Sequence, residues 1–222
     1  ADLALANRLA QAASHTGAGS EPDFVRAHAL SWLGRGEEAD AVLREIPTDE
    51  LTDGDQARLA FLRASNMLWA LGKPEEAKAI IDGAADVTTT AGRNYVDAFL
   101  TVFFFAMDQP LSAEAAAARL SVDDLPPVVG AEVAWALATI AGDAGRTDAA
   151  VSLAEAGYRA AERSFDAPHM RFNIADAHVA ALAMAGRLPE ALDVAQLVRG
   201  ASADLPGAAQ PLGPAVAGRA LL

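Results

Sequence analysis

The sequence predicts an all-α fold, a right-handed solenoid of tetratricopeptide-like antiparallel helix pairs with about five complete repeats. The first observation behind this prediction is the segment Leu71–Ala77, whose composition is typical of a turn between two helices. Gly72 can take the left-handed conformation that ends a helix, and Pro74 suits the first turn of the next one. Two glutamates follow Pro74, where the helix dipole favours negative charge.

The second observation is that this turn recurs at a regular interval. Its anchor residue occurs five times along the chain, at Gly34, Gly72, Asp108, Gly145 and Gly186. Neighbouring anchors are separated by 36–41 residues, an interval typical of repeats made of two helices. An alanine follows each anchor by five positions, at Ala39, Ala77, Ala113, Ala150 and Ala191. A small residue at this fixed place favours a close crossing of the two helices.

The third observation is the composition, which is 52% hydrophobic, rich in alanine and poor in β-branched alternation. It favours helices over strands. The expected helix pairs are 21–33 with 36–46, 54–71 with 74–84, 92–107 with 111–120, 129–144 with 147–163, and 169–185 with 189–199, flanked by single helices at 3–14 and 208–222. No linker interrupts this series, so residues 1–222 are predicted to form a single helical-repeat domain. The chain lacks an initiator Met and ends inside an expected helix, so we expect a segment of a longer protein.

Charge and composition argue against several classes of function. The net charge of −13 disfavours direct contact with nucleic acid or an anionic membrane. There is no cysteine, and the four histidines lack the close spacing of zinc ligands. No apolar run is long enough to span a bilayer and no signal peptide opens the chain, which predicts a cytoplasmic location.

Catalytic motifs are also missing from the sequence. It contains no phosphate-binding loop, no H-E-x-x-H and no G-x-S-x-G. Glu132 and Asp176 could in principle form a glycosidase carboxylate pair, although arrays of this period rarely carry hydrolysis. We therefore expect no enzyme, no catalytic residue, no metal site and no cofactor in this segment.

Candidate ligand-binding residues emerge by counting back from each anchor to the first helix of its pair, which lines the concave face of such a solenoid. All three tryptophans and several polar residues fall on this face. The candidates are Trp32, Asn66, Trp69, Tyr95, Glu132, Trp135, Asn173 and Asp176, with His28 and Phe105 as weaker members. Aromatic rings next to amides and carboxylates suit a sugar, whose C–H face packs on a ring while its hydroxyls require donors and acceptors.

Each candidate also has a structural alternative. A tryptophan at helical spacing can belong to the core between repeats, and Asn66 can instead hydrogen-bond a neighbouring helix. Structural roles are favoured for His28 and His178, and the run Phe103–Phe105 belongs mostly to the core.

Two segments, Ala27–Ala39 and Arg63–Ala77, resemble the helical-repeat sensor region of large actinobacterial LuxR-type transcription regulators of the STAND class, related to the maltose-regulon activator. The resemblance implies further domains in the same polypeptide, a nucleotide-binding module before the sensor and a helix-turn-helix module after it. It also implies an inducer, a malto-oligosaccharide in the founding case, and self-association of the full-length regulator.

These observations lead to two hypotheses of different class. The first is an effector-sensing domain that binds a small carbohydrate, such as trehalose or a malto-oligosaccharide, on the concave face. The alternative is a protein–protein interaction scaffold whose groove binds a peptide or partner subunit. A sugar site would be a compact pocket at one or two repeats, whereas a peptide groove would make contacts along every repeat.

Overall fold

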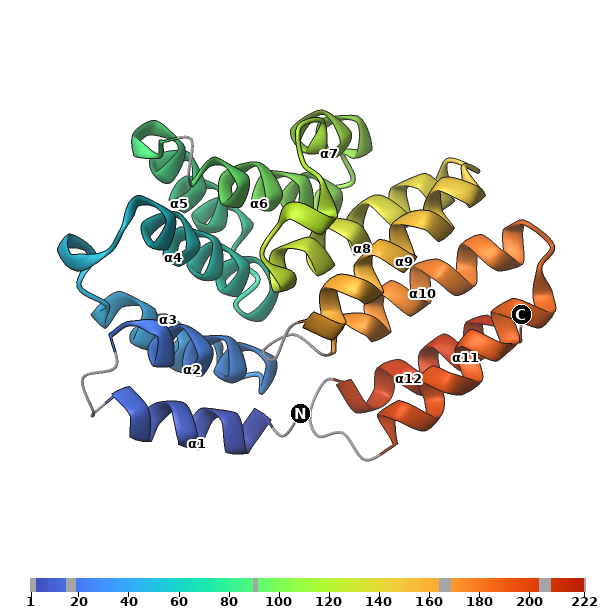
Figure 1. Cartoon of the computed structure of the whole chain (residues 1–222), viewed down its shortest axis with the longest axis horizontal. Coiled ribbons are helices and arrows are strands. Elements are labelled where there is room, and N and C mark those ends of the chain that lie inside the picture. The colour runs from blue at the N-terminus through green and yellow to red at the C-terminus, as the bar shows by residue number, and fades with distance from the viewer. Residues whose placement is uncertain (1–2, 15–18, 90–91, 164–168, 204–208, 222) are drawn as a thin grey trace. The chain divides into compact units, whose positions relative to one another are not determined.

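The computed structural model describes residues 3–14, 19–89, 92–163, 169–203 and 209–221, and over these ranges the chain is helical with no strand (Figure 1). The predicted all-α class is therefore confirmed. Contacts between Cα atoms divide the chain into two compact units, Ala1–Phe103 and Phe104–Leu222, and each is described by itself. The predicted single domain is not tested by this division and remains a prediction.

The first unit contains two helix hairpins preceded by a single helix. Its elements are α1 (Leu3–Ser14), α2 (Glu21–Trp32), α3 (Gly36–Glu45), the short 3₁₀ helix η1 (Thr48–Glu50), α4 (Asp53–Ser65), the π-helical turn η2 (Asn66–Ala70), α5 (Pro74–Val87) and α6 (Arg93–Ala106), whose last residues belong to the second unit. Helix α2 packs on α3, and α4 with η2 packs on α5. Connections of three residues join the helices of each pair, so the partners run antiparallel.

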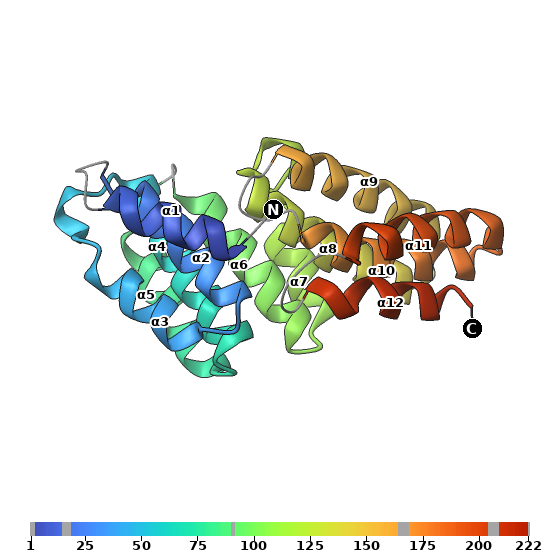
Figure 2. The same ribbon diagram turned by 90° about the horizontal axis from the view of Figure 1, so that it is seen from below.

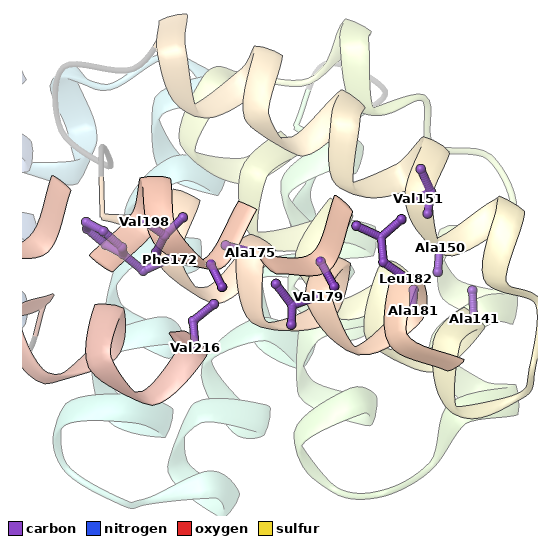
Figure 3. Close-up of a cluster of buried hydrophobic side chains, with 12 residues drawn as sticks. Ala141, Ala150, Val151, Phe172, Ala175, Val179, Ala181, Leu182, Val198 and Val216 are labelled. Atoms are coloured by element: carbon purple, nitrogen blue, oxygen red, sulfur yellow. The ribbon is translucent and has the colours of Figure 1, made fainter. Parts of the chain in front are cut away.

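The second unit continues the same pattern. Its elements are α7 (Pro110–Ala117), the 3₁₀ helix η3 (Val122–Asp124), α8 (Pro127–Asp143), α9 (Thr147–Arg163), α10 (Met170–Met184), α11 (Leu188–Ser202) and α12 (Ala209–Arg219). Helix α10 contacts α8, α9, α11 and α12, so it forms the centre of this unit (Figure 2). Its apolar side chains, including Phe172, Val179 and Leu182, meet residues of the neighbouring helices in one buried cluster (Figure 3).

All five anchor residues have positive φ, as predicted for residues that end a helix. The φ angles are 74° at Gly34, 64° at Gly72, 55° at Asp108, 74° at Gly145 and 74° at Gly186. Asp108 occupies the place of a glycine in the weakest copy of the turn, and aspartate tolerates the left-handed conformation better than most residues do. The five turns therefore share the left-handed conformation at the anchor.

The alanines that follow the anchors are completely buried. The exposed fraction is 0% at Ala39, Ala77, Ala113, Ala150 and Ala191. Glycine allows still closer approach at Gly157 of α9, where a Cβ atom would lie 2.9 Å from the Cβ of Ala134 and 3.0 Å from Cδ1 of Ile174. The predicted close helix crossings are therefore present.

The second repeat contains one extra residue in its first helix. In the other four repeats, the amide after the anchor donates to the carbonyl five residues earlier, as Arg35 does to Leu30 at 2.9 Å. In the second repeat Lys73 instead donates to Met67, six residues earlier, at 2.8 Å, and Leu71 donates to Asn66 at 3.1 Å. The π-helical turn η2 accommodates this residue.

The extra residue shifts the predicted register of α4 by one position. The count from the anchor that gives Phe24 in the first repeat gives Leu62 in the second. The residue that matches Phe24 is instead Phe61, since Phe24 and Phe61 are each 1% exposed. By the same shift, Arg58 is the residue of the second repeat that matches Glu21 of the first. The two side chains form an ion pair at 2.5 Å. The predicted inner face of the second repeat is therefore wrong for residues before Asn66.

Replacing Gly72 with alanine tests the left-handed turn. No atom lies within 4 Å of the added Cβ, so the expected loss of about 1–2 kcal/mol in the free energy of unfolding comes from the backbone conformation alone. The matched control is Gly83→Ala in the exposed interior of α5, where alanine should stabilise by about 0.5–1 kcal/mol. Urea denaturation measures both, and effects of the same sign would contradict this account.

Candidate functional site

The candidate residues divide between the two units. His28, Trp32, Asn66, Trp69 and Tyr95 lie in the first unit, whereas Phe105, Glu132, Trp135, Asn173 and Asp176 lie in the second. Each set is therefore described within its own unit.

In the first unit, Trp69 is the most accessible of the candidate aromatic side chains. It lies in η2 and is 47% exposed. Trp32 ends α2, which packs against η2, and its indole is partly exposed. The buried ring of His28 lies one turn before Trp32, with ring centroids 6.5 Å apart. Packing of α2 against η2 thus brings two indoles and an imidazole onto adjoining elements.

Asn66 has a structural role, which was the predicted alternative to ligand binding. Its side chain is only 2% exposed, and its Nδ2 donates to the carbonyl oxygen of Gly36 at 2.9 Å. Gly36 permits this approach because a Cβ there would lie 2.9 Å from the Cβ of Ala70. The bond joins the π-helical turn to the first residue of α3 and leaves the amide inaccessible to solvent.

Tyr95 lies at the end of a column of aromatic side chains. Its ring contacts Phe61 at 6.0 Å between centroids, Phe61 contacts Phe99 at 6.3 Å, and Phe99 contacts Phe103 at 6.1 Å. Phe61 and Phe99 are completely buried. Tyr95 therefore extends the aromatic core to the edge of α6, and Phe103 belongs to the core as expected.

In the second unit, Trp135 and Phe105 pack edge to face, with centroids 5.0 Å apart. Glu132 precedes Trp135 by one turn of α8 and is 7% exposed. The structure thus brings three of the candidates together, although the carboxylate is largely shielded from solvent.

Asn173 and Asp176 share one face of α10, as their spacing predicts. Asp176 accepts from Nε of Arg219 at 2.6 Å, and this ion pair joins α10 to α12. The amide nitrogen of Asn173 lies 3.8 Å from the sulfur of Met170. Asp176 is therefore already paired within the protein.

A cavity of about 570 Å³ between α9, α10 and α11 was not predicted. It is lined by Tyr158, Ala161, Glu162, Arg171, Phe172, Val194, Leu197, Val198 and Ala201, and none of the candidate residues is among them. Most of these residues come from the second helices of the fourth and fifth repeats, whereas the count from the anchors selects first helices only. The one sequence signal is Arg171, a charged residue between the apolar Met170 and Phe172.

One lining residue of this cavity, Tyr158, belongs to a partly buried polar pair. The hydroxyl of Tyr158 lies 3.3 Å from Nδ1 of His178. Burial raises the pKa of Tyr158 far above its ordinary value, so the phenol stays protonated. Burial also lowers the pKa of His178, against the opposing attraction of Glu155. His178 thus has the structural role that its sequence context favoured.

No described helix has both the length and the apolar character needed to cross a membrane. Within the same described ranges, no three or more acidic or histidine side chains gather in a way that could hold a metal ion.

The chain matches no protein-family model, no curated protein and no solved structure.

Replacing Asn66 with alanine tests its structural role. The substitution removes the donor to the Gly36 carbonyl inside the protein, so the free energy of unfolding should fall by about 1–3 kcal/mol. The matched control is Asn94→Ala on the exposed surface of α6, expected to stay within about 0.5 kcal/mol of the wild type. Equal effects of the two variants in urea denaturation would contradict the role given to Asn66.

His178 should make the fold less stable in mild acid. Because the pKa of its folded state is lowered, the unfolded chain binds the proton more readily once the pH falls below about 6.5. The stabilisation by neutral His178 is complete above that pH and is lost as the pH falls toward the folded pKa. Urea denaturation at pH 7.5 and pH 5.5 should show a smaller loss for His178→Gln than for the wild type. Equal losses would show that His178 titrates normally in the folded protein.

Proposed function

We propose that the chain is the effector-sensing domain of a cytoplasmic LuxR-type transcription regulator, and that its helix pairs stack as a right-handed tetratricopeptide-like solenoid. Two features support the solenoid: the five turns with positive φ and the buried alanine at the same place in each second helix. The regulator itself is proposed from the resemblance of Ala27–Ala39 and Arg63–Ala77 to sensor regions of that class. The nucleotide-binding and DNA-binding modules would belong to other parts of the same polypeptide.

The proposed effector is a small carbohydrate, and the observation that carries this choice is the exposure of Trp69. An indole that is 47% exposed offers an apolar face to solvent, and the C–H face of a sugar ring packs on such a surface. Trp69 lies in a π-helical turn, a feature that is frequent at functional sites. Trp32, which is partly exposed at the adjoining end of α2, is the second aromatic side chain proposed to contact the sugar.

A route from the sugar to the helices follows from the neighbours of Trp69. The turn that holds Trp69 begins at Asn66, whose side chain is bonded to Gly36 at the start of α3. A sugar bound to Trp69 would therefore contact a turn that is hydrogen-bonded, through Asn66, to α3, the second helix of the first repeat. Sensing requires that the sugar bind one arrangement of these helices more tightly than another. Affinities of about 1 μM to 1 mM suffice, equivalent to roughly −8 to −4 kcal/mol.

Isothermal titration calorimetry with trehalose and a series of malto-oligosaccharides tests this proposal. We expect one of these sugars to bind, and Trp69→Ala to weaken its binding at least tenfold, because the substitution removes the stacking surface. The matched control is Val87→Ala, which removes another exposed apolar side chain of the first unit and should leave binding unchanged. Circular dichroism confirms that both variants fold.

Two results would overturn the proposal. If no sugar binds while a peptide or partner subunit binds tightly, the chain is an interaction scaffold. If a sugar binds equally well to the wild type and to Trp69→Ala, the site lies elsewhere in the chain.

A further inference from the structure

We propose that the cavity between α9, α10 and α11 binds a small amphipathic anion, namely a monocarboxylate with an aliphatic chain of medium length. This site is separate from Trp69, and its ligand is chemically different from the proposed carbohydrate. Its volume of about 570 Å³ is within the range of about 300–1,000 Å³ that is usual for small-molecule sites.

The walls of the cavity favour an apolar body for the ligand. Phe172, Val198 and Ala161 are 0%, 6% and 4% exposed. Val194 is partly buried, and Leu197 at the opening is 75% exposed. In the close-up of the buried cluster, Phe172 of α10 and Val198 of α11 lie close together (Figure 3). An aliphatic chain in the cavity would contact these side chains and cover Leu197, removing apolar surface from water.

Arg171 favours an anionic head group. Its Nε is shielded from solvent and has no hydrogen-bond acceptor among the described residues. The guanidinium carbon lies 5.0 Å from the ring centroid of Phe172. The residue as a whole is partly exposed and lines the cavity, so a carboxylate there would pair with the guanidinium through a charge-assisted bond.

Ion pairing separates Arg171 from two arginines on neighbouring helices. The sequence has 30 acidic and 17 basic residues, and two arginines on neighbouring helices pair with carboxylates, Arg159 with Asp123 and Arg219 with Asp176. Within the described ranges, Arg171 forms no such ion pair, although it lines a cavity together with Glu162. Its charge is therefore available to a ligand.

Glu162 supports a rival ligand, an amphipathic cation. The side chain of Glu162 is exposed at the cavity, so water already solvates its carboxylate and little is gained by pairing it. The Nε of Arg171 lacks that solvation. The hydroxyl of Tyr158 is already bonded to His178, which leaves Arg171 as the donor that requires a partner. The anion is therefore favoured over the cation.

Three probes with the same ten-carbon chain test the proposal: decanoate, decanol and decyltrimethylammonium. Each is titrated into the protein by isothermal titration calorimetry, the two ionic probes below their critical micelle concentrations and decanol below its solubility limit. We expect decanoate to bind at one site, at least tenfold more tightly than decanol, and decyltrimethylammonium not to bind. Methyl NMR locates the site, because decanoate should shift the resonances of Val194, Leu197 and Val198.

Substitutions in the cavity test separately the contacts of the ligand's head group and those of its aliphatic chain. Arg171→Gln should weaken decanoate about tenfold while leaving decanol within about twofold of its wild-type affinity. The matched control is Arg163→Gln in the last turn of α9, which removes the same charge from a residue outside the cavity and should leave decanoate binding nearly unchanged. Val194→Trp fills the cavity and should weaken decanoate and decanol alike.

The proposal is overturned if decanoate does not saturate a single site, if decyltrimethylammonium binds as well as decanoate, or if Arg171→Gln has no effect. It stands or falls independently of the carbohydrate site. Trp69→Ala should leave decanoate binding unchanged, and a failure of every sugar to bind would leave the cavity result intact.

Discussion

The left-handed residue at the end of each first helix is the constraint on which the rest of the fold depends. A helix end leaves carbonyl groups without partners, and the positive φ of the anchor lets the next amide turn back and bond one of them. The chain then reverses within three residues, so the second helix packs on the first. The antiparallel pairing of the two helices on either side of each anchor follows from this reversal.

Small side chains determine how close the paired helices come. Alanine at a fixed distance from each anchor removes the bulk that would hold the helices apart, and Gly157 of α9 extends the same effect to its contact with Ala134 of α8, where even a Cβ would be too large. Large side chains such as Phe172 then fill the space between successive pairs (Figure 3). Close approach within a pair and bulky packing between pairs are complementary parts of one core.

The helices could be predicted from the sequence because their ends have local chemical causes. Glycine or aspartate at the anchor, followed by proline at Pro74, Pro110 and Pro189, predicts most boundaries to within a few residues, as at α5 and α11. The π-helical turn could not be predicted, because Asn66–Ala70 contains neither glycine nor proline and the extra residue is evident only from the backbone hydrogen bonds of the folded chain. The cavity was also beyond prediction, since its residues come from three helices whose separation depends on tertiary packing. Among the candidate residues, the residue type alone did not show that Trp69 is exposed whereas Asn66 is hydrogen-bonded inside the protein.

The π-helical turn also bears on how such a chain can change in length during evolution. One additional residue in the first helix of a pair is absorbed within η2, and the helix still ends on Gly72 with the usual left-handed conformation. Since each residue of an α-helix rotates the chain by about 100°, removing that residue would turn the segment before η2 relative to Trp69 by the same angle. A single-codon insertion can thus redirect a surface side chain while the helix pairs on either side keep their packing. A repeat of unequal length can in this way present a different side chain at the surface of an unchanged fold.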